Sequence, residues 1–210
     1  MITDYLMALP AYILGSIPTA VWVGKAKYGL DIREHGSKNA GATNTFRVLG
    51  KKAGRVVLSI DVLKGAVAVL LPYFLLGYDF SAPELTHVQL VASFLAVLGH
   101  VFPLFANFKG GKGVATSLGV IIGLQPVAAA FCIVIFLVVF IVSNYVSLGS
   151  ICASIGFAIS LWTFWGLDYT KTVALPIFGT LLGAIVIFAH RKNIKRLLDG
   201  TESKMNLFKK

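Results

Sequence analysis

Residues 126–143 have the sequence PVAAAFCIVIFLVVFIVS, which contains no charged side chain. An α-helix rises about 1.5 Å per residue, so a helix of this length comes close to crossing the ~30 Å hydrocarbon core of a bilayer. The stretch therefore predicts a transmembrane helix. Six further apolar runs flank it: Tyr5–Val23, Gly54–Leu76, His87–Ala106, Val114–Leu124, Ser147–Gly166 and Thr172–Ala189. The pattern predicts an all-α integral membrane protein with seven transmembrane helices.

The overall composition agrees with this fold class. Hydrophobic residues make up 57% of the 210 residues and the mean hydropathy is +0.81, whereas a soluble domain is roughly 45–50% apolar. Seven spans of about 20 residues, with the loops that connect them, leave room for little else, so residues 1–210 are expected to form a single membrane-embedded domain without a separate soluble domain. The first run has no preceding basic region and no clear small-residue cleavage site, so we interpret it as an uncleaved span.

The run Val114–Leu124 is shorter than the others and is followed at once by Gln125-Pro126. A helix of this length covers about half of a ~30 Å core. Proline lacks a backbone donor and restricts the residue before it, so the helix should stop there. The sequence predicts one short or broken helix near residues 114–126, either a short span or a re-entrant half-helix.

The basic residues indicate which loops share a side of the membrane. Seventeen of the nineteen Lys and Arg residues fall in three segments: Lys25–Arg55, Phe108–Gly113 and the tail from His190. Basic loops are retained in the cytoplasm, and four apolar runs separate the second segment from the third. Seven crossings then put the N-terminus outside and the C-terminus in the cytoplasm. The net charge of +10 follows from this sidedness and would attract anionic lipid, so nucleic-acid binding is not predicted.

The remaining charges agree with this topology. The expected outer loops contain acidic residues and a single basic exception: Asp4, Asp79, Glu84 and Asp168, with Lys171. Inside the second run, Asp61 and Lys64 are three residues apart and can pair. Charged residues within a span are functional candidates by default; the alternative, which we adopt, is an ion pair with a structural role. Neither a metal site nor a disulfide framework is predicted, because Cys132 and Cys152 lie in apolar runs without metal-ligand spacing.

A first polar segment, Phe108–Thr116, contains Gly110, Gly111 and Lys112 and leads directly into an apolar helix. Glycines let backbone N–H groups approach an anion, and a helix N-terminus adds donors with partial positive charge. The segment is therefore a candidate phosphate site, with a flexible cytoplasmic turn as the alternative. It lacks the Gly and the Ser or Thr that a nucleotide-binding P-loop requires, so nucleotide hydrolysis is not indicated.

A second polar segment, His35–Arg47, is rich in small residues. Such a loop can form a nest of backbone donors, and Arg47 can bind a phosphate with two parallel hydrogen bonds. The side chains that could add hydrogen bonds are Ser37, Asn39, Thr43 and Asn44. A solvated loop between helices is the alternative interpretation.

A third polar segment, His190–Leu198, is expected to continue the last span as a helix. His190 and Asn193 are three residues apart and share a face. A histidine beside a phosphate could act as a general base or as a phosphate ligand. The alternative is an anchor helix whose apolar side chains lie in the membrane interface while its basic side chains meet lipid headgroups.

Three groups of motifs occur in this order: Gly36-Ser37-x-Asn39-x-Gly41-Ala42-Thr43-Asn44; Gly99-His100-x-Phe102-Pro103 with Lys109–Thr116; and His190-Arg191-x-Asn193-Ile194-x-Arg196-Leu197 with Gly200-x-Glu202. Together they resemble the bacterial acyl-phosphate:glycerol-3-phosphate acyltransferase family (PlsY). The resemblance extends from Gly15-Ser16-Ile17-Pro18 to Glu202, which is nearly the whole chain.

The resemblance implies a seven-helix enzyme of the bacterial inner membrane with its active site on the cytoplasmic face. The enzyme would transfer a fatty acyl group from acyl phosphate to the 1-hydroxyl of glycerol 3-phosphate, giving lysophosphatidic acid and inorganic phosphate in the first acylation of phospholipid synthesis. No cofactor and no metal are implied. The implied partners are the two substrates, membrane lipids and the upstream enzyme that makes acyl phosphate.

The resemblance also implies residue roles. Acyl phosphate would be held by Ser37, Asn39, Gly41, Ala42, Thr43 and Asn44. Glycerol 3-phosphate would be held by Arg47, Gly110, Gly111, Lys112 and Ser147. His190 and Asn193 would be catalytic and orient the attacking glycerol phosphate, and Glu202 would be structural.

The residues fit this chemistry in their own right. Both substrates carry a phosphate, and the chain offers two basic, Gly-containing loops. Acyl phosphate is already activated, so positioning and stabilisation of the developing oxyanion could suffice. The competing class is a transporter of a phosphorylated solute, but transporters usually show paired repeats and a midplane site, and the sequence shows no evident repeat. A membrane scaffold without enzymatic activity would leave the phosphate-type loops unexplained.

Overall fold

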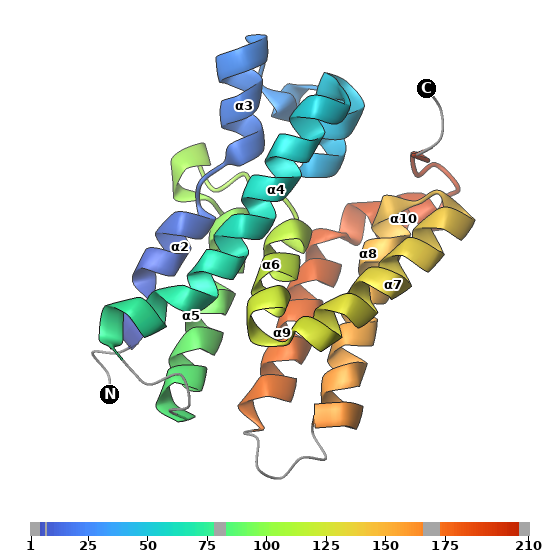
Figure 1. Ribbon diagram of the computed structural model, residues 1–210. Helices are drawn as coiled ribbons and strands as arrows, with labels where there is room; N and C mark the ends of the chain where they lie inside the picture. The colour runs from blue at the N-terminus through green and yellow to red at the C-terminus, as the bar shows by residue number, and fades with distance from the viewer. Residues whose placement is uncertain (1–4, 7, 78–82, 166–172, 206–210) are drawn as a thin grey trace. The chain divides into compact units, whose positions relative to one another are not determined.

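The computed structural model describes residues 5–6, 8–77, 83–165 and 173–205, and every regular element within these ranges is a helix (Figure 1). The chain divides into two compact units, Met1–Leu124 and Gln125–Lys210. The boundary between them falls at the Gln125-Pro126 break that the sequence predicts. Several charges used in the topology argument lie outside the described residues: Asp4, Asp79, Asp168, Lys171, Lys209 and Lys210.

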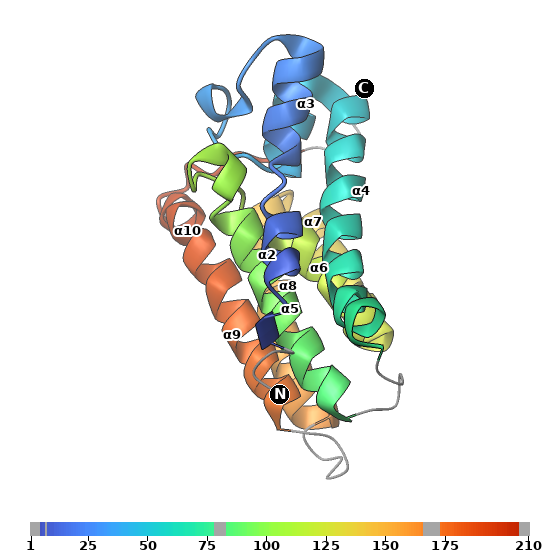
Figure 2. The same ribbon diagram turned by 90° about the vertical axis from the view of Figure 1, so that its left-hand side faces the viewer.

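The N-terminal unit is a bundle of helices with two short 3₁₀ turns. Its elements are α2 (Leu9–Gly15), α3 (Thr19–Tyr28), η1 (Ile32–Glu34), α4 (Ala42–Leu76), α5 (Pro83–Val101), η2 (Leu104–Ala106) and α6 (Val114–Leu124). Helix α4 packs against α2, α5 and α6. Helix α3 and the first turns of α4 lie at one end of this unit in both ribbon views (Figures 1 and 2).

Helices α4 and α6 cross with their backbones in close contact. A Cβ atom added to Gly119 would overlap the carbonyl oxygen of Val62, and one added to Gly65 would overlap the carbonyl oxygen of Thr116. Small residues allow membrane helices to approach in this way. Gly119 and Gly123, four residues apart on α6, therefore serve packing within the chain.

Two helices differ from the apolar runs that predict them. The run Tyr5–Val23 is not one continuous helix, because α2 ends at Gly15 and α3 begins only at Thr19; Pro18, which has no N–H to donate, lies at the break. Conversely, α4 begins at Ala42, well before the run that starts at Gly54. It kinks at Gly50, which has φ 85° and ψ 178°, a conformation that glycine adopts readily.

The C-terminal unit contains α7 (Pro126–Ser143), α8 (Val146–Ser160), the π-helical turn η3 (Leu161–Trp165), α9 (Ala174–Ala189) and α10 (Arg191–Leu198). Helix α8 packs against both α7 and α9. Helices α7 and α8 form a hairpin whose connection starts at Asn144, which takes a left-handed conformation with φ 61°. The axis bends by 60° between α9 and α10.

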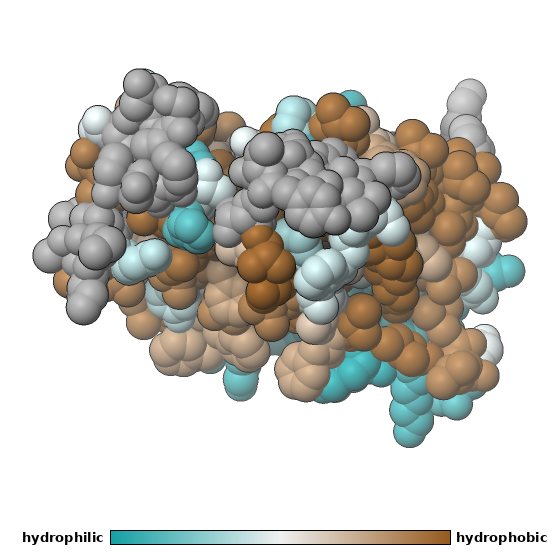
Figure 3. Space-filling view, turned by 90° about the horizontal axis from the view of Figure 1, so that it is seen from below, coloured by the Kyte–Doolittle hydropathy of each residue, from teal (hydrophilic) through white to brown (hydrophobic). Residues whose placement is uncertain are grey.

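Four helices of the described chain are long and apolar enough to cross a membrane, and the bent pair α9–α10 would make a fifth. Helix α6 has only 11 residues, which confirms the short helix expected near residues 114–126. The remaining helices are too short to be identified as spans by length, so the count of seven crossings stays a prediction. Large apolar side chains such as Val142, which is 80% exposed, lie on the outside, and apolar residues cover much of the described surface in Figure 3.

Candidate active site

The loop before α4 is folded around the side chain of Asn44. The Nδ2 atom donates to the carbonyl oxygens of Ile32 and His35, both at 3.0 Å, and of Asn39 at 3.1 Å. Its Oδ1 accepts the backbone N–H of Ser37 at 2.9 Å, and the residue is 2% exposed. The carboxamide has only two N–H hydrogens, so Asn44 is committed to shaping the loop.

The other candidate residues of this loop lie around the N-terminus of α4. Gly41 is the N-cap, and Ala42 and Thr43 begin the helix. The first backbone N–H groups of a helix have no partner within it, which favours anions at this position. Ser37 is exposed, Asn39 is half-buried, and Arg47 is exposed in the second turn of α4.

The glycines of the second loop pack directly on the end of α5. The N–H of Gly110 donates to the carbonyl of Val101 at 3.2 Å, and that of Gly111 donates to the carbonyl of His100 at 3.1 Å. A Cβ atom on Gly111 would overlap Nε2 of His100. These two N–H groups therefore hold the loop against α5, and the half-buried Lys112 follows them just before α6.

The buried charges of α4 form the ion pair expected from their spacing. Lys64 Nζ lies 2.9 Å from Asp61 Oδ1, and the two residues are 4% and 1% exposed. The ammonium also donates to the carbonyl of Ile17 at 2.9 Å, and Thr19 Oγ1 donates to Asp61 Oδ1 at 3.0 Å. The pair therefore fastens the break between α2 and α3 to α4.

His100 joins the same buried cluster. Its Nδ1 lies 3.7 Å from Asp61 Oδ1, and the residue is 7% exposed. The carbonyl oxygen of His100 accepts the N–H of Gly111, and its Nε2 lies where a Cβ atom of Gly111 would be. One side of His100 therefore supports the second loop while the other faces the ion pair. These contacts and its burial are those of a structural residue.

In the C-terminal unit, three side chains converge on Glu202. Ser147 Oγ donates to Oε1 at 2.9 Å, Asn193 Nδ2 donates to Oε1 at 2.7 Å, and Arg196 Nε donates to Oε2 at 2.6 Å. Burial alone would raise the pKa of Glu202, but these hydrogen bonds outweigh it and hold the pKa below its usual value. The carboxylate is therefore kept charged, and it ties α8 to α10.

His190 occupies the bend between α9 and α10 and is 2% exposed. Its Nδ1 lies 2.8 Å from the carbonyl oxygen of Val186. A carbonyl oxygen can only accept, so Nδ1 carries the proton in this bond, and in the neutral ring Nε2 is the acceptor nitrogen. The backbone N–H of Asn193 donates to the carbonyl of His190 at 2.8 Å, which fixes the two predicted catalytic residues in one turn.

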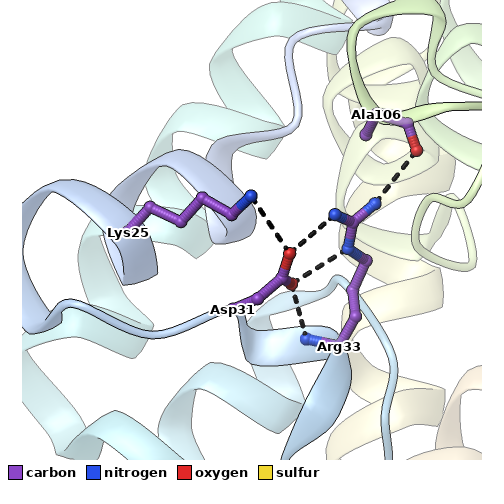
Figure 4. Close-up of polar contacts among 4 residues, drawn as sticks. All are labelled: Lys25, Asp31, Arg33 and Ala106. Atoms are coloured by element: carbon purple, nitrogen blue, oxygen red, sulfur yellow. Dashed lines mark hydrogen bonds and ion pairs between the residues drawn. The ribbon is translucent and has the colours of Figure 1, made fainter.

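Sequence reasoning missed a contact around Asp31 and Arg33 (Figure 4). Arg33 donates from Nε to Oδ1 of Asp31 at 2.9 Å and from Nη2 to Oδ2 at 2.6 Å. Its Nη1 donates to the carbonyl of Ala106 at 3.0 Å. The Arg33 guanidinium holds the pKa of Asp31 well below its usual range. The only signal in the sequence is an acidic residue two positions before an arginine in a mainly basic segment.

A cleft of about 440 Å³ lies beside this contact, and its lining includes Arg33, Lys38, Asn107 and Lys109. Asp31 and Glu34 also line it, so the cleft carries both signs of charge. Among the side chains that the structure describes, no group of three or more His, Cys, Asp or Glu residues could hold a metal ion.

A profile of the family described as glycerol-3-phosphate acyltransferase matches residues 5–200. The chain belongs to this family. A glycerol-3-phosphate acyltransferase of Chlorobaculum tepidum is 44% identical over 231 residues, with 100% of both chains covered. One from Geobacillus kaustophilus is 48% identical over 200 residues, with 95% of both chains covered.

Solved structures of glycerol-3-phosphate acyltransferases support the same family membership. The chain is similar to PlsY (YgiH), an integral membrane glycerol 3-phosphate acyltransferase, in its glycerol 3-phosphate form, with a TM-score of 0.85, 37% identity and coverage of 99% of this chain and 100% of that one. The chain is also similar to the lysophosphatidic acid form, with a TM-score of 0.81, 36% identity and coverage of 97% of this chain and 96% of that one. With this membership and its apolar helices, the chain is a multi-pass membrane protein.

Proposed function

We propose that this glycerol-3-phosphate acyltransferase uses acyl phosphate as its donor and acylates the 1-hydroxyl of glycerol 3-phosphate, giving lysophosphatidic acid and inorganic phosphate. This would be the first acylation of phospholipid synthesis. One observation supports the proposal: the loop before α4 and the loop of Lys112, which are the two candidate phosphate sites of the sequence, are joined in the N-terminal unit by the bond from Arg33 to Ala106. A donor and an acceptor that each carry a phosphate need two such loops.

In the N-terminal unit, we assign the acyl phosphate to the loop that Asn44 organises, with Ser37, Asn39, Gly41, Ala42 and Thr43 as its contacts. The N-terminus of α4 favours the negative charge there. We assign glycerol 3-phosphate to Arg47 and Lys112. Gly110 and Gly111 support this second site by allowing the loop to rest on His100.

In the C-terminal unit, we assign Ser147 to glycerol 3-phosphate and the orientation of its 1-hydroxyl to His190 and Asn193. Glu202 holds Asn193 and Ser147 in place through its hydrogen bonds. The structural roles of Asp61 and Lys64 lie in fastening α2 and α3 to α4. On this proposal residues 1–210 work as one membrane-embedded acyltransferase domain.

The proposed reaction needs no cofactor. The 1-hydroxyl oxygen bonds to the carbonyl carbon of the acyl phosphate, and the bond from that carbon to the phosphate oxygen breaks, so phosphate leaves. The hydroxyl proton passes to Nε2 of His190 or to the phosphate of glycerol 3-phosphate. Positioning of the two substrates and stabilisation of the developing oxyanion then supply the catalysis.

The proposed setting is the bacterial inner membrane, crossed seven times, with the N-terminus outside and the C-terminus and active site in the cytoplasm. The basic segments support this sidedness. The upstream enzyme that makes acyl phosphate would deliver its product at this face, and the acyl chain would remain in the bilayer.

The test is a product assay with purified protein, labelled glycerol 3-phosphate and chemically made palmitoyl phosphate, with no CoA, carrier protein or metal added. A parallel arm offers palmitoyl-CoA. Labelled lysophosphatidic acid from the acyl-phosphate arm alone is the expected result, and His190→Ala should abolish it. Product from the acyl-CoA arm alone would refute the proposed donor. Uptake of label into vesicles without product would favour a transporter.

A further inference from the structure

Arg33 connects two segments that lie far apart in the sequence, and each segment leads into one of the two candidate substrate loops. It lies four residues before Ser37, and Ala106 lies four residues before Gly110. The bond from Nη1 to the carbonyl of Ala106 spans 73 residues of sequence. The guanidinium is therefore a strut between the two loops of the N-terminal unit (Figure 4).

Asp31 fixes the orientation of the Arg33 side chain. Asp31 accepts from Nε and Nη2 of Arg33 and from the backbone N–H of Arg33, the last at 3.0 Å. Lys25 Nζ adds a fourth contact to Asp31 at 3.4 Å. A planar guanidinium can bind a carboxylate with two atoms and still donate from a third, whereas a lysine ammonium is a single point charge. Only arginine can therefore make all of these bonds together.

The ion pair by itself stabilises only the segment that carries both residues, because Asp31 and Arg33 are two positions apart and their side chains are 12% and 23% exposed. The bond from Nη1 of Arg33 to Ala106 reaches the second loop, and a stabilising role for the ion pair does not account for it. Such a contact can affect the reaction strongly by fixing the positions of the two loops, because a displacement of about 1 Å between reacting groups can cost roughly 100-fold in rate. Lys38 and Lys109, one from each loop, line the cleft beside the strut.

We infer that Arg33 is a positioning residue that sets the separation of the two substrate loops, with Asp31 holding it in the required orientation. Arg33 does not touch the substrates; it acts through Ala106 on the loop of Lys112 and through Asp31 on the loop of Asn44. The inference rests on the proposed function, since it assigns one substrate to each of these loops.

The test compares Arg33→Gln and Arg33→Lys with Lys27→Gln, a matched control on an exposed basic residue of α3. For each variant, kcat and the KM of each substrate are measured in the product assay, together with the unfolding temperature. Arg33→Gln should raise both KM values and lower kcat/KM by about tenfold or more. Arg33→Lys should fall between it and the unchanged protein, and Lys27→Gln should stay within about twofold.

Asp31→Asn supplies a second line of evidence. It should change the kinetics in the same direction as Arg33→Gln, and the double variant should be no worse than the single ones, because both changes break one strut. Kinetic constants of Arg33→Gln within about twofold of the unchanged protein would overturn the inference. The inference would also be overturned if kcat fell in proportion to the unfolded fraction of the protein while both KM values stayed unchanged. Absence of product from the unchanged protein would refute the proposed function itself, and this inference with it.

Discussion

Asn193 donates a hydrogen bond of 2.7 Å from Nδ2 to Oε1 of Glu202. The same carboxylate accepts from Ser147 and from Arg196, so one acidic residue orients a predicted catalytic side chain and a predicted substrate ligand. Glu202 comes nine residues after Asn193 and 55 after Ser147. It joins α10 to the start of α8.

Glu202→Gln should impair the enzyme strongly. The Gln side chain keeps an oxygen for Asn193 and Ser147 but would present an N–H₂ group to the Arg196 donor. Loss of hydrogen bonds to a charged group costs about 1.5–3 kcal/mol, so we expect activity to fall roughly 10- to 100-fold. The product assay measures this, and Asp199→Asn, an exposed acidic residue of the same segment, is the control. Equal activity in both variants would contradict this role for Glu202.

The stability that Glu202 supplies should depend on pH. Its folded pKa is lowered, so its carboxylate stabilises the folded protein above the usual Glu pKa of about 4.3. That contribution is lost as the pH falls through the lower folded pKa. The difference in unfolding temperature between the unchanged protein and Glu202→Gln should therefore be largest near neutral pH and shrink below about pH 4. A difference that is constant over this range would show that the charge of Glu202 contributes nothing.

Lys64→Met should destabilise the protein severely. It leaves the Asp61 carboxylate buried without its cation, and breaking a buried pair costs about 3–5 kcal/mol. Unfolding in detergent measures the effect, with the exposed Lys52→Met on the same helix expected to stay within about 0.5 kcal/mol. The double variant Asp61→Leu/Lys64→Met should recover part of the loss, because no buried charge remains. A double variant less stable than Lys64→Met would contradict this account.

Gly111→Ala should disable the second loop while leaving the helices folded. The added Cβ would overlap His100 Nε2, so the segment that carries Lys112 must move. We expect a loss of about 100-fold in kcat/KM for glycerol 3-phosphate, as for other small displacements at an active site. Combining it with His100→Ala should restore part of the activity, since the smaller side chain makes room. If the two changes are simply additive, the contact does not limit activity.

The long apolar helix α7 and the short helix α6 followed from local properties of the sequence. Residues 126–143 form α7 as predicted, and Pro126 begins a new helix after α6, because hydrophobic length and the missing proline donor act within a few residues. The Asp61–Lys64 pair was equally predictable, since residues three apart on a helix are neighbours.

Other features depended on contacts that no local pattern contains. Asn44 looked like a substrate ligand from its neighbours in sequence, yet its carboxamide is used by three carbonyls of its own loop. Gly110 and Gly111 looked like donors for an anion, yet their N–H groups bond to α5. The kink at Gly50 was missed, because a single glycine in a polar stretch has many possible uses.

By itself the sequence determined that the protein is helical and membrane-embedded, where its short helix lies and which three segments carry polar chemistry. These follow from hydrophobicity, proline and charge, which act locally along the chain. The tertiary structure alone decided that Arg33 bonds to Ala106 and that Ser147 bonds to Glu202. Each of these bonds joins residues more than 50 positions apart, and such partners meet only when helix packing brings their segments together.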